Sequence, residues 1–218
     1  MQRVLEPEYM DTAEEADGYQ DMDHSAANEA VVTDFLTLGG GSCASVIDLG
    51  TGPGDIPILL AQRSAIPNIV GIDAAEHMLR LARPKVDALG LSDRITFQLA
   101  DVKQLPFADG AFDGVFSNTI LHHIPEPLFF LREAGRVLAP NGRLLIRDLY
   151  RPADEATVQQ LVDLHAATAN DYQRKLFYDS LCASLTLEEI RDCAADAGLG
   201  RARIEMTSDR HYTIEIGH

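Results

Sequence analysis

The sequence predicts an α/β fold in which helices cover both faces of a Rossmann-like, mostly parallel sheet. Short apolar segments alternate with segments of helical period from residue 44 onward, and this alternation implies βαβ crossovers between parallel strands. A glycine-rich loop at residues 50–54 directly follows the first apolar segment. The last two apolar segments are joined by a short connection, so we expect them to pair as an antiparallel hairpin.

Residues 1–40 precede the alternation and are expected to form an N-terminal helical arm. The first 30 residues contain nine acidic residues and one basic residue, Arg3, a pattern that favours a short helical or irregular segment. Apolar residues from Val31 to Leu38 then recur with a helical period. Three glycines at residues 39–41 end this helix.

Five strands of the central region are predicted from short apolar runs bounded by turn residues. They lie at residues 44–49, 68–73, 94–99, 112–117 and 143–149. Helices are predicted between them. One begins near residue 55, one spans residues 75–89, and one is opened by Pro125 and Pro127 and runs to Leu138. Pro57 is compatible with a first helical turn, whereas Pro84 predicts a kink or a break in the second of these helices.

Residues 150–185 interrupt the alternation with two helical patterns, and we expect a helical insertion over the sheet edge. Thr186 and Glu189 have the spacing of a capping box, which predicts a helix from there to about residue 197. Two strands, at residues 201–206 and 211–216, follow this helix and form the expected closing hairpin.

We expect one domain over residues 1–218, because no linker, repeat or low-complexity tract interrupts the chain. A chain of 218 residues can bury a substantial single core. Residues 1–40 form the N-terminal helical arm and residues 44–150 the core of this expected domain. Residues 150–185 form the helical insertion, and residues 186–218 the last helix and the closing hairpin.

The composition excludes several functions. The chain has 18 Lys and Arg residues against 34 Asp and Glu residues, a net charge of −16, which disfavours binding to nucleic-acid phosphates. No apolar run reaches the roughly 20 residues of a membrane helix, and the first residues show no leader pattern. The three cysteines have no disulfide or metal-ligand spacing. We therefore expect a cytoplasmic protein with no membrane, nucleic-acid or metal partner.

The strongest functional signal is the loop Asp48-Leu49-Gly50-Thr51-Gly52-Pro53-Gly54, between the first strand and the next helix. Glycines in such a loop let the backbone turn sharply and approach a ligand, and the helix N-terminus attracts negative charge. The G-x-G-x-G spacing differs from the G-x-G-x-x-G of dinucleotide enzymes. The alternative interpretation is a purely structural turn.

Polar residues recur at the ends of the next strands. Asp73 ends the second strand, 21 residues beyond Gly52, where a carboxylate can accept hydrogen bonds from ribose hydroxyls. The corresponding residues after the third and fourth strands are Asp101, Val102, Ser117, Asn118, His122 and His123. Each alone is more often a solvated strand end. Together they predict a ligand site, because ligands of open parallel sheets bind at the carboxyl ends of the strands.

These motifs together resemble the class I S-adenosylmethionine-dependent methyltransferases. The similar pieces lie within residues 44–150 and read VIDLGTGPGD, IVGIDAAEHM, ITFQLADVKQLPFADGAFDGVFSN, TILHHI and RVLAPNGRLLIRD. Within the class, the chain is most similar to small-molecule methyltransferases of the ubiquinone/menaquinone-biosynthesis type. The resemblance implies S-adenosylmethionine as cofactor, a small-molecule acceptor, and a seven-stranded sheet whose last strand is antiparallel.

The resemblance also implies roles for individual residues. Gly50, Thr51 and Gly52 would lie against the methionine part of the cofactor, and Asp73 would bind its ribose. The other implied cofactor-binding residues are Ala74 and Met78 near the ribose, Asp101 and Val102 at the adenine, and Ser117, Asn118 and His122 toward the methionine end.

An acceptor that is protonated at neutral pH also needs a general base. The candidate bases are His24, His122, His123, Asp148 and His211. For His122 and His123, the alternative interpretation is a helix start beside the cofactor. The candidate acceptor-binding residues are Tyr19, Arg147, Tyr178 and Arg210. The polar residues around Arg147 and Arg210 indicate either an anion-recognising pocket or surface ion pairs.

Residues 1–30 and 150–185 flank the resemblance, and we expect them to fold over the cofactor as a lid that excludes water. Arg147, Arg210 and His211 would form the floor of this site. The alternative is a disordered acidic tail. The functional alternatives are transfer of another group from a sulfonium cofactor, a non-catalytic S-adenosylmethionine-binding protein, and a nicotinamide dehydrogenase, which the glycine spacing disfavours. We expect a monomer or a homodimer.

Overall fold

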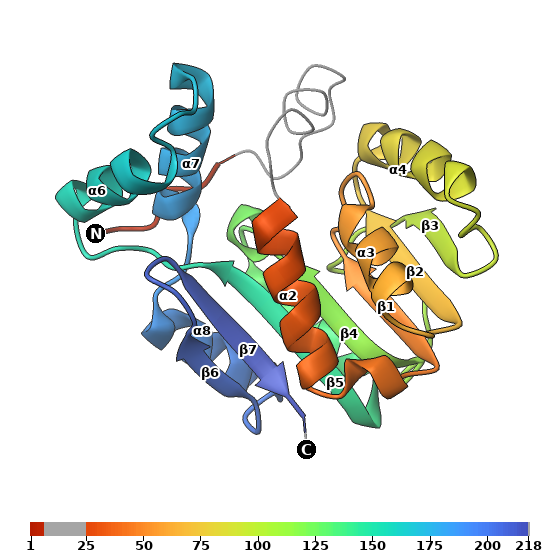
Figure 1. Ribbon diagram of the computed structural model, residues 1–218. Helices are drawn as coiled ribbons and strands as arrows, with labels where there is room; N and C mark the ends of the chain where they lie inside the picture. The colour runs from red at the N-terminus through yellow and green to blue at the C-terminus, as the bar shows by residue number, and fades with distance from the viewer. Residues whose placement is uncertain (7–24, 218) are drawn as a thin grey trace.

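The computed structural model describes residues 1–6 and 25–217. Its centre is a sheet of seven strands in the order β3-β2-β1-β4-β5-β7-β6 (Figure 1). The strands are β1 (Ser45–Leu49), β2 (Asn68–Asp73), β3 (Ile95–Leu99), β4 (Phe112–Asn118), β5 (Leu138–Leu149), β6 (Arg203–Met206) and β7 (His211–Ile216). Neighbours among β1 to β5 are parallel, and β7 is antiparallel to both β5 and β6. The predicted fold class, with its antiparallel last strand, is confirmed.

Helices lie on both faces of this sheet (Figure 1). They are α2 (Ser25–Thr37), α3 (Asp55–Arg63), α4 (Glu76–Ala88), α5 (Pro127–Val137), α6 (Glu155–His165), α7 (Asp171–Ala183) and α8 (Leu187–Asp196), with short 3-10 helices η1 (Gly40–Ser42) and η2 (Leu121–His123). Apolar residues of α2, α3 and α4 share one buried cluster with the sheet, and those of α5 and α8 share the other. The removal of these side chains from water stabilises the three layers.

Three elements differ from the sequence prediction. Helix α2 begins at Ser25, earlier than predicted, because the alanine-rich residues before its apolar stretch also favour a helix. Helix α4 continues through Pro84 without a break. Pro84 is exposed, so water can bind the carbonyl group that the proline leaves unpaired. Strand β5 begins at Leu138, five residues before the predicted start at Arg143. It extends this far because Leu138 pairs with Phe112, beyond a register shift in β4 between Phe112 and Gly114.

The strand order reverses between β1 and β4. From β1 the chain moves outward to β2 and β3, and it then returns to place β4 on the other side of β1. In an open parallel sheet, such a reversal leaves a crevice between the loops at the carboxyl ends of the two strands. The loop that contains the glycines and the segment after β4 therefore meet at a place suited to a ligand.

The N-terminal segment, residues 1–6, lies against α7 (Figure 1). The N–H of Val4 donates to the carbonyl of Cys182 at 3.1 Å, and Nε of Arg3 donates to the carbonyl of Ala183 at 2.6 Å. Helices α6 and α7 pack on each other and on Leu149 at the end of β5. The two regions that flank the core in sequence are thus in contact, at least through residues 1–6.

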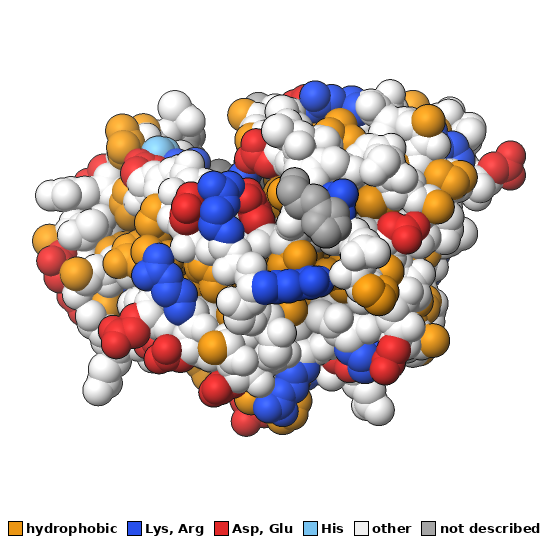
Figure 2. Space-filling model, turned by 90° about the horizontal axis from the view of Figure 1, so that it is seen from below, with side chains coloured by type: hydrophobic (Ala, Val, Ile, Leu, Met, Phe, Trp, Pro, Cys, Tyr) orange, Lys and Arg blue, Asp and Glu red, His pale blue; other side chains and the backbone are white. Residues whose placement is uncertain are grey.

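One face of the molecule bears mixed charges. On the face seen from below in Figure 2, acidic and basic side chains are interspersed, and the basic ones form no continuous stripe among the residues described there. Within the described ranges, no helix is both long and apolar enough to cross a membrane.

Gly114 provides a test of the packing between α2 and the sheet. A Cβ atom at this position of β4 would lie 2.8 Å from Phe35 Cζ and 2.9 Å from Val46 Cγ2. We expect Gly114→Ala to lower the free energy of unfolding by about 1–3 kcal/mol, as overpacked cores do. Gly200→Ala is the control, because nothing lies within 4 Å of the point that its methyl group would occupy, and it should change stability by less than about 1 kcal/mol. Urea unfolding measures both, and equal midpoints for the two variants would contradict the packing argument.

Candidate active site

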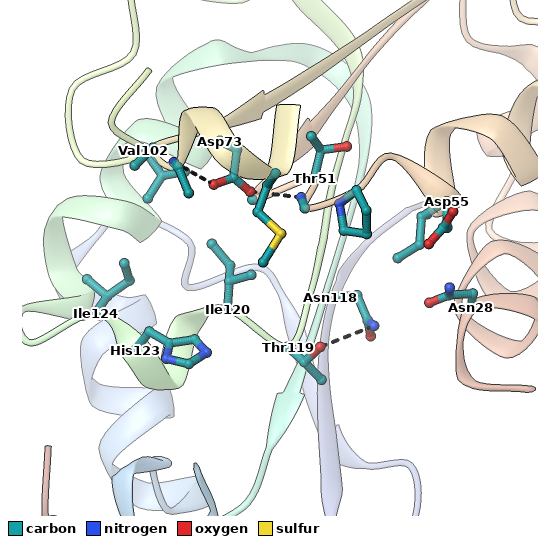
Figure 3. Close-up of a pocket in the computed structure, with 17 residues that line it drawn as sticks. Asn28, Thr51, Asp55, Asp73, Val102, Asn118, Thr119, Ile120, His123 and Ile124 are labelled. Carbon is teal, nitrogen blue, oxygen red and sulfur yellow. Dashed lines mark hydrogen bonds between the residues drawn. The ribbon is translucent and has the colours of Figure 1, made fainter. Parts of the chain in front are cut away.

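A cavity lies at the carboxyl edge of the sheet, where the loops after β1 and β4 meet (Figure 3). Its walls come from the glycine loop, the end of β2 and start of α4, the segment after β3, the segment from β4 to η2, and α2. The lining residues are Asn28, Gly50, Thr51, Gly52, Pro53, Asp55, Ile56, Asp73, Ala74, Ala75, Met78, Val102, Asn118, Thr119, Ile120, His123 and Ile124. The structure thus brings together nine of the residues predicted from sequence for the ligand site: Gly50, Thr51, Gly52, Asp73, Ala74, Met78, Val102, Asn118 and His123.

The glycine loop depends on backbone conformations that favour glycine. Gly50, Gly52 and Gly54 have φ angles of 76°, 54° and 77°, values that other residues adopt only with strain. A Cβ atom at Gly50 would meet the side chain of Ile120 at 2.7 Å, whereas no atom lies within 4 Å of the corresponding point at Gly52. The loop is therefore packed on one side and leaves open space at Gly52, where a ligand can approach the backbone.

Asp73 connects the glycine loop to the end of β2. Its Oδ2 accepts a hydrogen bond from the N–H of Gly52 at 2.8 Å, and its Oδ1 accepts one from the N–H of Ala75 at 2.9 Å. Asp73 also lines the cavity. Its carboxylate therefore fixes the loop and lies where hydroxyl groups of a ligand could donate to it.

Asp48 is buried beneath the same loop. It is only 1% exposed, and neither of its carboxylate oxygens has a hydrogen-bond partner among the described residues. Burial raises the pKa of Asp48 to about 7, and the nearby Asp73 carboxylate acts in the same direction. A positively charged ligand group over the loop would favour the ionised form of Asp48, so the site is suited to a cationic or zwitterionic ligand.

The end of β4 forms the opposite wall. Asn118 lines the cavity, and its Nδ2 donates to Oγ1 of Thr119 at 3.3 Å. Thr119 has a φ of 54°, a conformation that costs a β-branched residue on the order of 1–3 kcal/mol. Ser117 does not line the cavity, because its side chain is buried and its Oγ donates to the carbonyl of Leu49 at 2.7 Å. Ser117 therefore links β4 to β1 rather than facing the open space.

His122 and Asp148 form a buried pair behind the cavity. Nδ1 of His122 lies 2.6 Å from Oδ1 of Asp148, and the two side chains are 3% and 1% exposed. The Asp148 carboxylate also accepts hydrogen bonds from the N–H groups of Leu121 and Leu149, at 2.6 and 2.7 Å. Neither His122 nor Asp148 lines the cavity, so the pair positions η2 and is not part of the cavity wall.

The protonation of this pair follows from its surroundings. Burial opposes protonation of His122, but the carboxylates of Asp148 and Glu6 outweigh this effect and raise its pKa. Burial also opposes ionisation of Asp148, but His122 and the backbone N–H groups outweigh it and lower the pKa of Asp148. The surroundings therefore favour the ionised form of both members of the pair.

Among the candidate bases that the structure describes, His123 lines the cavity. Figure 3 shows its ring at the cavity beside Ile120 and Ile124. Its Nδ1 lies 3.0 Å from Oε1 of Glu6 but has no aligned hydrogen-bond partner among the described residues. Glu6 belongs to the N-terminal segment, so this segment contacts a residue of the cavity wall.

Several predicted site residues lie away from the cavity. Successive residues of a strand point to opposite faces of the sheet, so Arg147 faces α2 and pairs with Asp34, whereas Asp148 faces η2. Arg210 pairs with Asp209 and contacts His165. For Arg147 and Arg210 the ion-pair alternative is therefore the one observed, and the predicted floor of arginines is not assembled at the cavity.

The remaining predicted residues are also accounted for by local contacts. The Asp101 carboxylate accepts a hydrogen bond from the N–H of Lys103 at 2.8 Å and does not line the cavity. Nδ1 of His211 lies 2.9 Å from Oγ of Ser208, and burial lowers the pKa of His211 to about 4. Tyr178 packs against the cluster formed by α6 and α7. The predicted residues Tyr19 and His24 lie outside the described residues.

Sequence reasoning missed part of the cavity wall. Pro53, Ala75, Thr119 and Ile120 are sequence neighbours of predicted residues, so the motifs already pointed to their positions. Asn28 gave no signal, because α2 reaches the cavity only through the packing of the arm on the sheet.

Comparison with known proteins identifies the family. A family model described as a methyltransferase domain matches residues 41–204, which is most of the chain. The chain therefore belongs to this methyltransferase domain family, and the resemblance found in its motifs is confirmed.

Curated relatives cover part of the chain. The methyltransferase GfsG of Streptomyces halstedii is 38% identical over 104 residues, which are 48% of this chain and 37% of the relative. The demethylmenaquinone methyltransferase of Thermus thermophilus is 41% identical over 107 residues, which are 49% of this chain and 48% of the relative. The chain thus spans about half or less of the length of these curated relatives.

Solved structures share the fold. An S-adenosylmethionine-dependent methyltransferase from Aquifex aeolicus has a TM-score of 0.66 and 21% identity, covering 94% of this chain and 97% of that one. The plantazolicin methyltransferase BpumL, solved in complex with SAH, has a TM-score of 0.71 and 15% identity, covering 92% and 88% of the two chains. The fold of this chain is therefore that of S-adenosylmethionine-dependent methyltransferases.

The Asp148–His122 pair gives a prediction about stability. Asp148→Asn removes the nearer of the two carboxylates that pair with His122 and leaves that of Glu6, at 3.4 Å. Breaking a buried pair in this way costs about 3–5 kcal/mol of unfolding free energy. Because the pKa of His122 is raised in the folded state, its contribution is complete below the usual histidine pKa of about 6.5 and is lost as the pH rises through the folded pKa. In the Asp148→Asn variant, the unfolding free energy should therefore fall less than in the parent as the pH rises above neutral.

The control for this prediction is Asp209→Asn, which removes the carboxylate of the exposed His165–Asp209 pair. Exposed pairs contribute about 0–1 kcal/mol, so this variant should unfold close to the parent. Urea unfolding between pH 5 and pH 9 (about two units either side of neutral) measures both variants. If Asp148→Asn and Asp209→Asn lower the unfolding free energy by the same small amount, the buried pair does not organise η2.

Proposed function

We propose that this chain transfers a methyl group from S-adenosylmethionine to a small-molecule acceptor. The single observation that supports this most is the open space at Gly52, bounded by the acceptor oxygens of Asp73 within the same cavity. The family assignment and the fold support the same activity. Relatives whose names include demethylmenaquinone and 27-O-demethylrifamycin SV act on small molecules, which supports an acceptor of that size.

The cavity residues fit the cofactor by their chemistry. Gly50, Thr51 and Gly52 would contact the methionine part, and the buried carboxylate of Asp48 below them would complement a positive charge. Asp73 would accept hydrogen bonds from the ribose hydroxyls. Val102 and Met78 would pack at the adenine side, and Asn118 at the methionine end. Asp101, Ser117 and His122 would support this wall from behind.

The bound cofactor would supply a methyl group that is already activated on a sulfonium. The protein then has to align the acceptor and exclude water, since proximity and orientation lower the barrier. For an acceptor that must lose a proton, His123 is our candidate base because it lines the cavity. His122 and Asp148 would hold η2, and through it His123, in position.

We also propose a lid formed by residues 1–30 and 150–185. The hydrogen bonds from Val4 to Cys182 and from the Met1 amino group to Ala153, at 3.1 and 2.7 Å, support it. Asn28 at the cavity supports a role for the arm in the site. We further propose a cytoplasmic enzyme, a monomer or a homodimer, that does not bind nucleic acid. The net charge of −16 supports the last of these, because nucleic-acid phosphates repel an acidic protein.

The activity is tested by incubating the protein with S-adenosylmethionine and fractionated metabolite pools, and by detecting new methylated products by mass spectrometry. A product that is heavier by one methyl group, and that depends on the protein, is the expected result. A product that bears another group from the cofactor would indicate a different transferase. Cofactor binding without any product would indicate a non-catalytic binding protein.

Asp73 provides the test of the cofactor assignment. Asp73→Asn should weaken S-adenosylhomocysteine binding about tenfold to a hundredfold, because charge-assisted hydrogen bonds contribute about 1.5–3 kcal/mol each. Asp101→Asn is the matched control, since its carboxylate bonds to Lys103 and lies outside the cavity wall, and it should bind more tightly than the Asp73 variant. Calorimetry measures both. Equal affinities would refute the role of Asp73, and binding of NAD in place of the sulfur nucleosides would refute the cofactor.

Deletion of residues 1–25 tests the lid. The truncated protein should keep the folded sheet, measured by circular dichroism, because both large core clusters are made of residues from Val31 onward. Its turnover on an identified acceptor should fall strongly, because the cover that excludes water is missing. Full activity of the truncated protein would show that the arm has no part in the reaction.

A further inference from the structure

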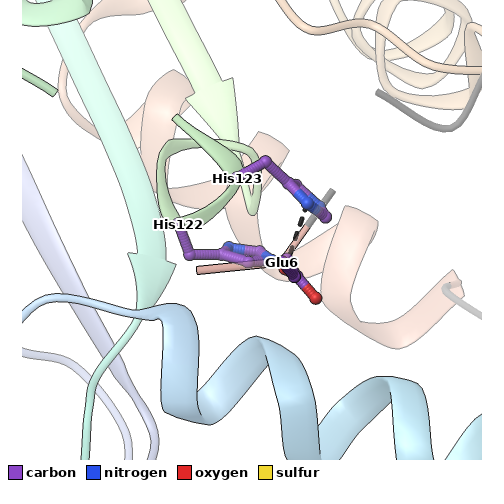
Figure 4. A group of neighbouring side chains, drawn as sticks. All are labelled: Glu6, His122 and His123. Atoms are coloured by element: carbon purple, nitrogen blue, oxygen red, sulfur yellow. Dashed lines mark ion pairs between the residues drawn. The ribbon is translucent and has the colours of Figure 1, made fainter. Parts of the chain in front are cut away.

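Glu6, His122 and His123 form a compact cluster next to the cavity (Figure 4). One carboxylate oxygen, Oε1 of Glu6, lies 3.0 Å from Nδ1 of His123 and 3.4 Å from Nε2 of His122. The potential ligand atoms of the three residues all lie within 4.8 Å of one another. The cluster therefore presents two imidazole nitrogens and one carboxylate oxygen to a common point.

The two distances from Glu6 to the imidazole nitrogens are those of ligands on a single metal ion. Ligand atoms at about 2.1 Å from an ion are about 3.0 Å apart at a right angle and about 3.4 Å apart at a tetrahedral angle. A shared proton explains the arrangement less well, because Nδ1 of His123 has no aligned hydrogen-bond partner among the described residues. An ion would satisfy both imidazole nitrogens and the carboxylate together.

The surroundings of the cluster hold its donors in place. Asp148 lies 2.6 Å from Nδ1 of His122, so Nε2 is the nitrogen left to bind a metal, as in carboxylate–histidine–metal arrangements. Oγ of Ser180 lies 3.3 Å from both oxygens of Glu6. The side chains of His122 and Glu6 are 3% and 7% exposed, so water competes weakly for these donors. The guanidinium of Arg3, which donates to the carbonyls of His122 and Ile124, offsets part of the negative charge.

We propose that Glu6, His122 and His123 bind a divalent transition-metal ion such as Zn²⁺ or Co²⁺. Two imidazoles and a carboxylate suit these ions, whereas Mg²⁺ and Ca²⁺ prefer oxygen ligands. Three protein ligands leave a coordination position open, and His123 lines the cavity. With the metal bound, His123 would be a ligand and not the base. The ion would bind an oxygen of the acceptor and favour its deprotonated form, with the proton released to water, a role that rests on the proposed function. This proposal replaces the expectation of no metal site.

The experiment uses the full chain after chelator treatment and dialysis. Zn²⁺ is titrated by calorimetry, and Co²⁺ by its visible absorption. We expect one tightly bound ion per chain, and a rise in the unfolding temperature with Zn²⁺. Glu6→Gln and His123→Gln should each weaken Zn²⁺ binding by at least about tenfold and abolish the thermal shift. The control is His165→Gln, which alters an exposed histidine beside Asp209 and should bind the ion as the parent does.

The proposal is wrong if the parent protein binds Zn²⁺ no more tightly than Glu6→Gln does. It is also wrong if only His165→Gln loses Zn²⁺ binding. Circular dichroism checks that the variants fold, and if His123→Gln does not, Glu6→Gln decides the question. Binding of S-adenosylhomocysteine is measured separately on the metal-free protein. If the protein binds Zn²⁺ but not S-adenosylhomocysteine, only the proposed function is refuted. If it binds S-adenosylhomocysteine but not Zn²⁺, only the metal site is refuted.

Discussion

The carboxylate of Asp148 holds together the elements behind the cavity. It accepts hydrogen bonds from Leu121 and Leu149 and pairs with His122, so it joins the end of β5 to the loop after β4. Its burial makes these partners obligatory, because an unpaired ion in the interior is costly. The position of His123 at the cavity and the direction of His122 toward Glu6 both follow from this one group.

The fold was predictable because its signals are local. Each strand of the core is a short apolar run, and each glycine or proline turn lies beside one, so the alternation and the closing hairpin could be read from neighbouring residues. The capping box of Thr186 and Glu189 is present as predicted, with hydrogen bonds of 3.3 and 2.9 Å. The missed features depend on tertiary context, such as the exposure that lets α4 tolerate Pro84.

The site was predictable only where strand ends define it. The carboxyl ends of parallel strands all lie at one edge of the sheet. Gly52, Asp73 and Asn118, which follow or end such strands, could therefore be expected to lie close together there. It was harder to predict which face of a strand a residue occupies. Arg147 and Asp148 are adjacent in sequence, yet their side chains point to opposite layers. Glu6 could not be found at all, since its partners lie 116 and 117 residues further along the chain.

The hydrogen bonds of the N-terminal segment have a consequence for the order of assembly. Arg3 and Ala183 are 180 positions apart, so the loop closed by their contact includes most of the polypeptide. Closing so long a loop is entropically unfavourable until the intervening chain has condensed. During folding, residues 1–6 therefore dock only after α7 has formed, so the contacts of Glu6 beside the cavity are completed after those of the glycine loop.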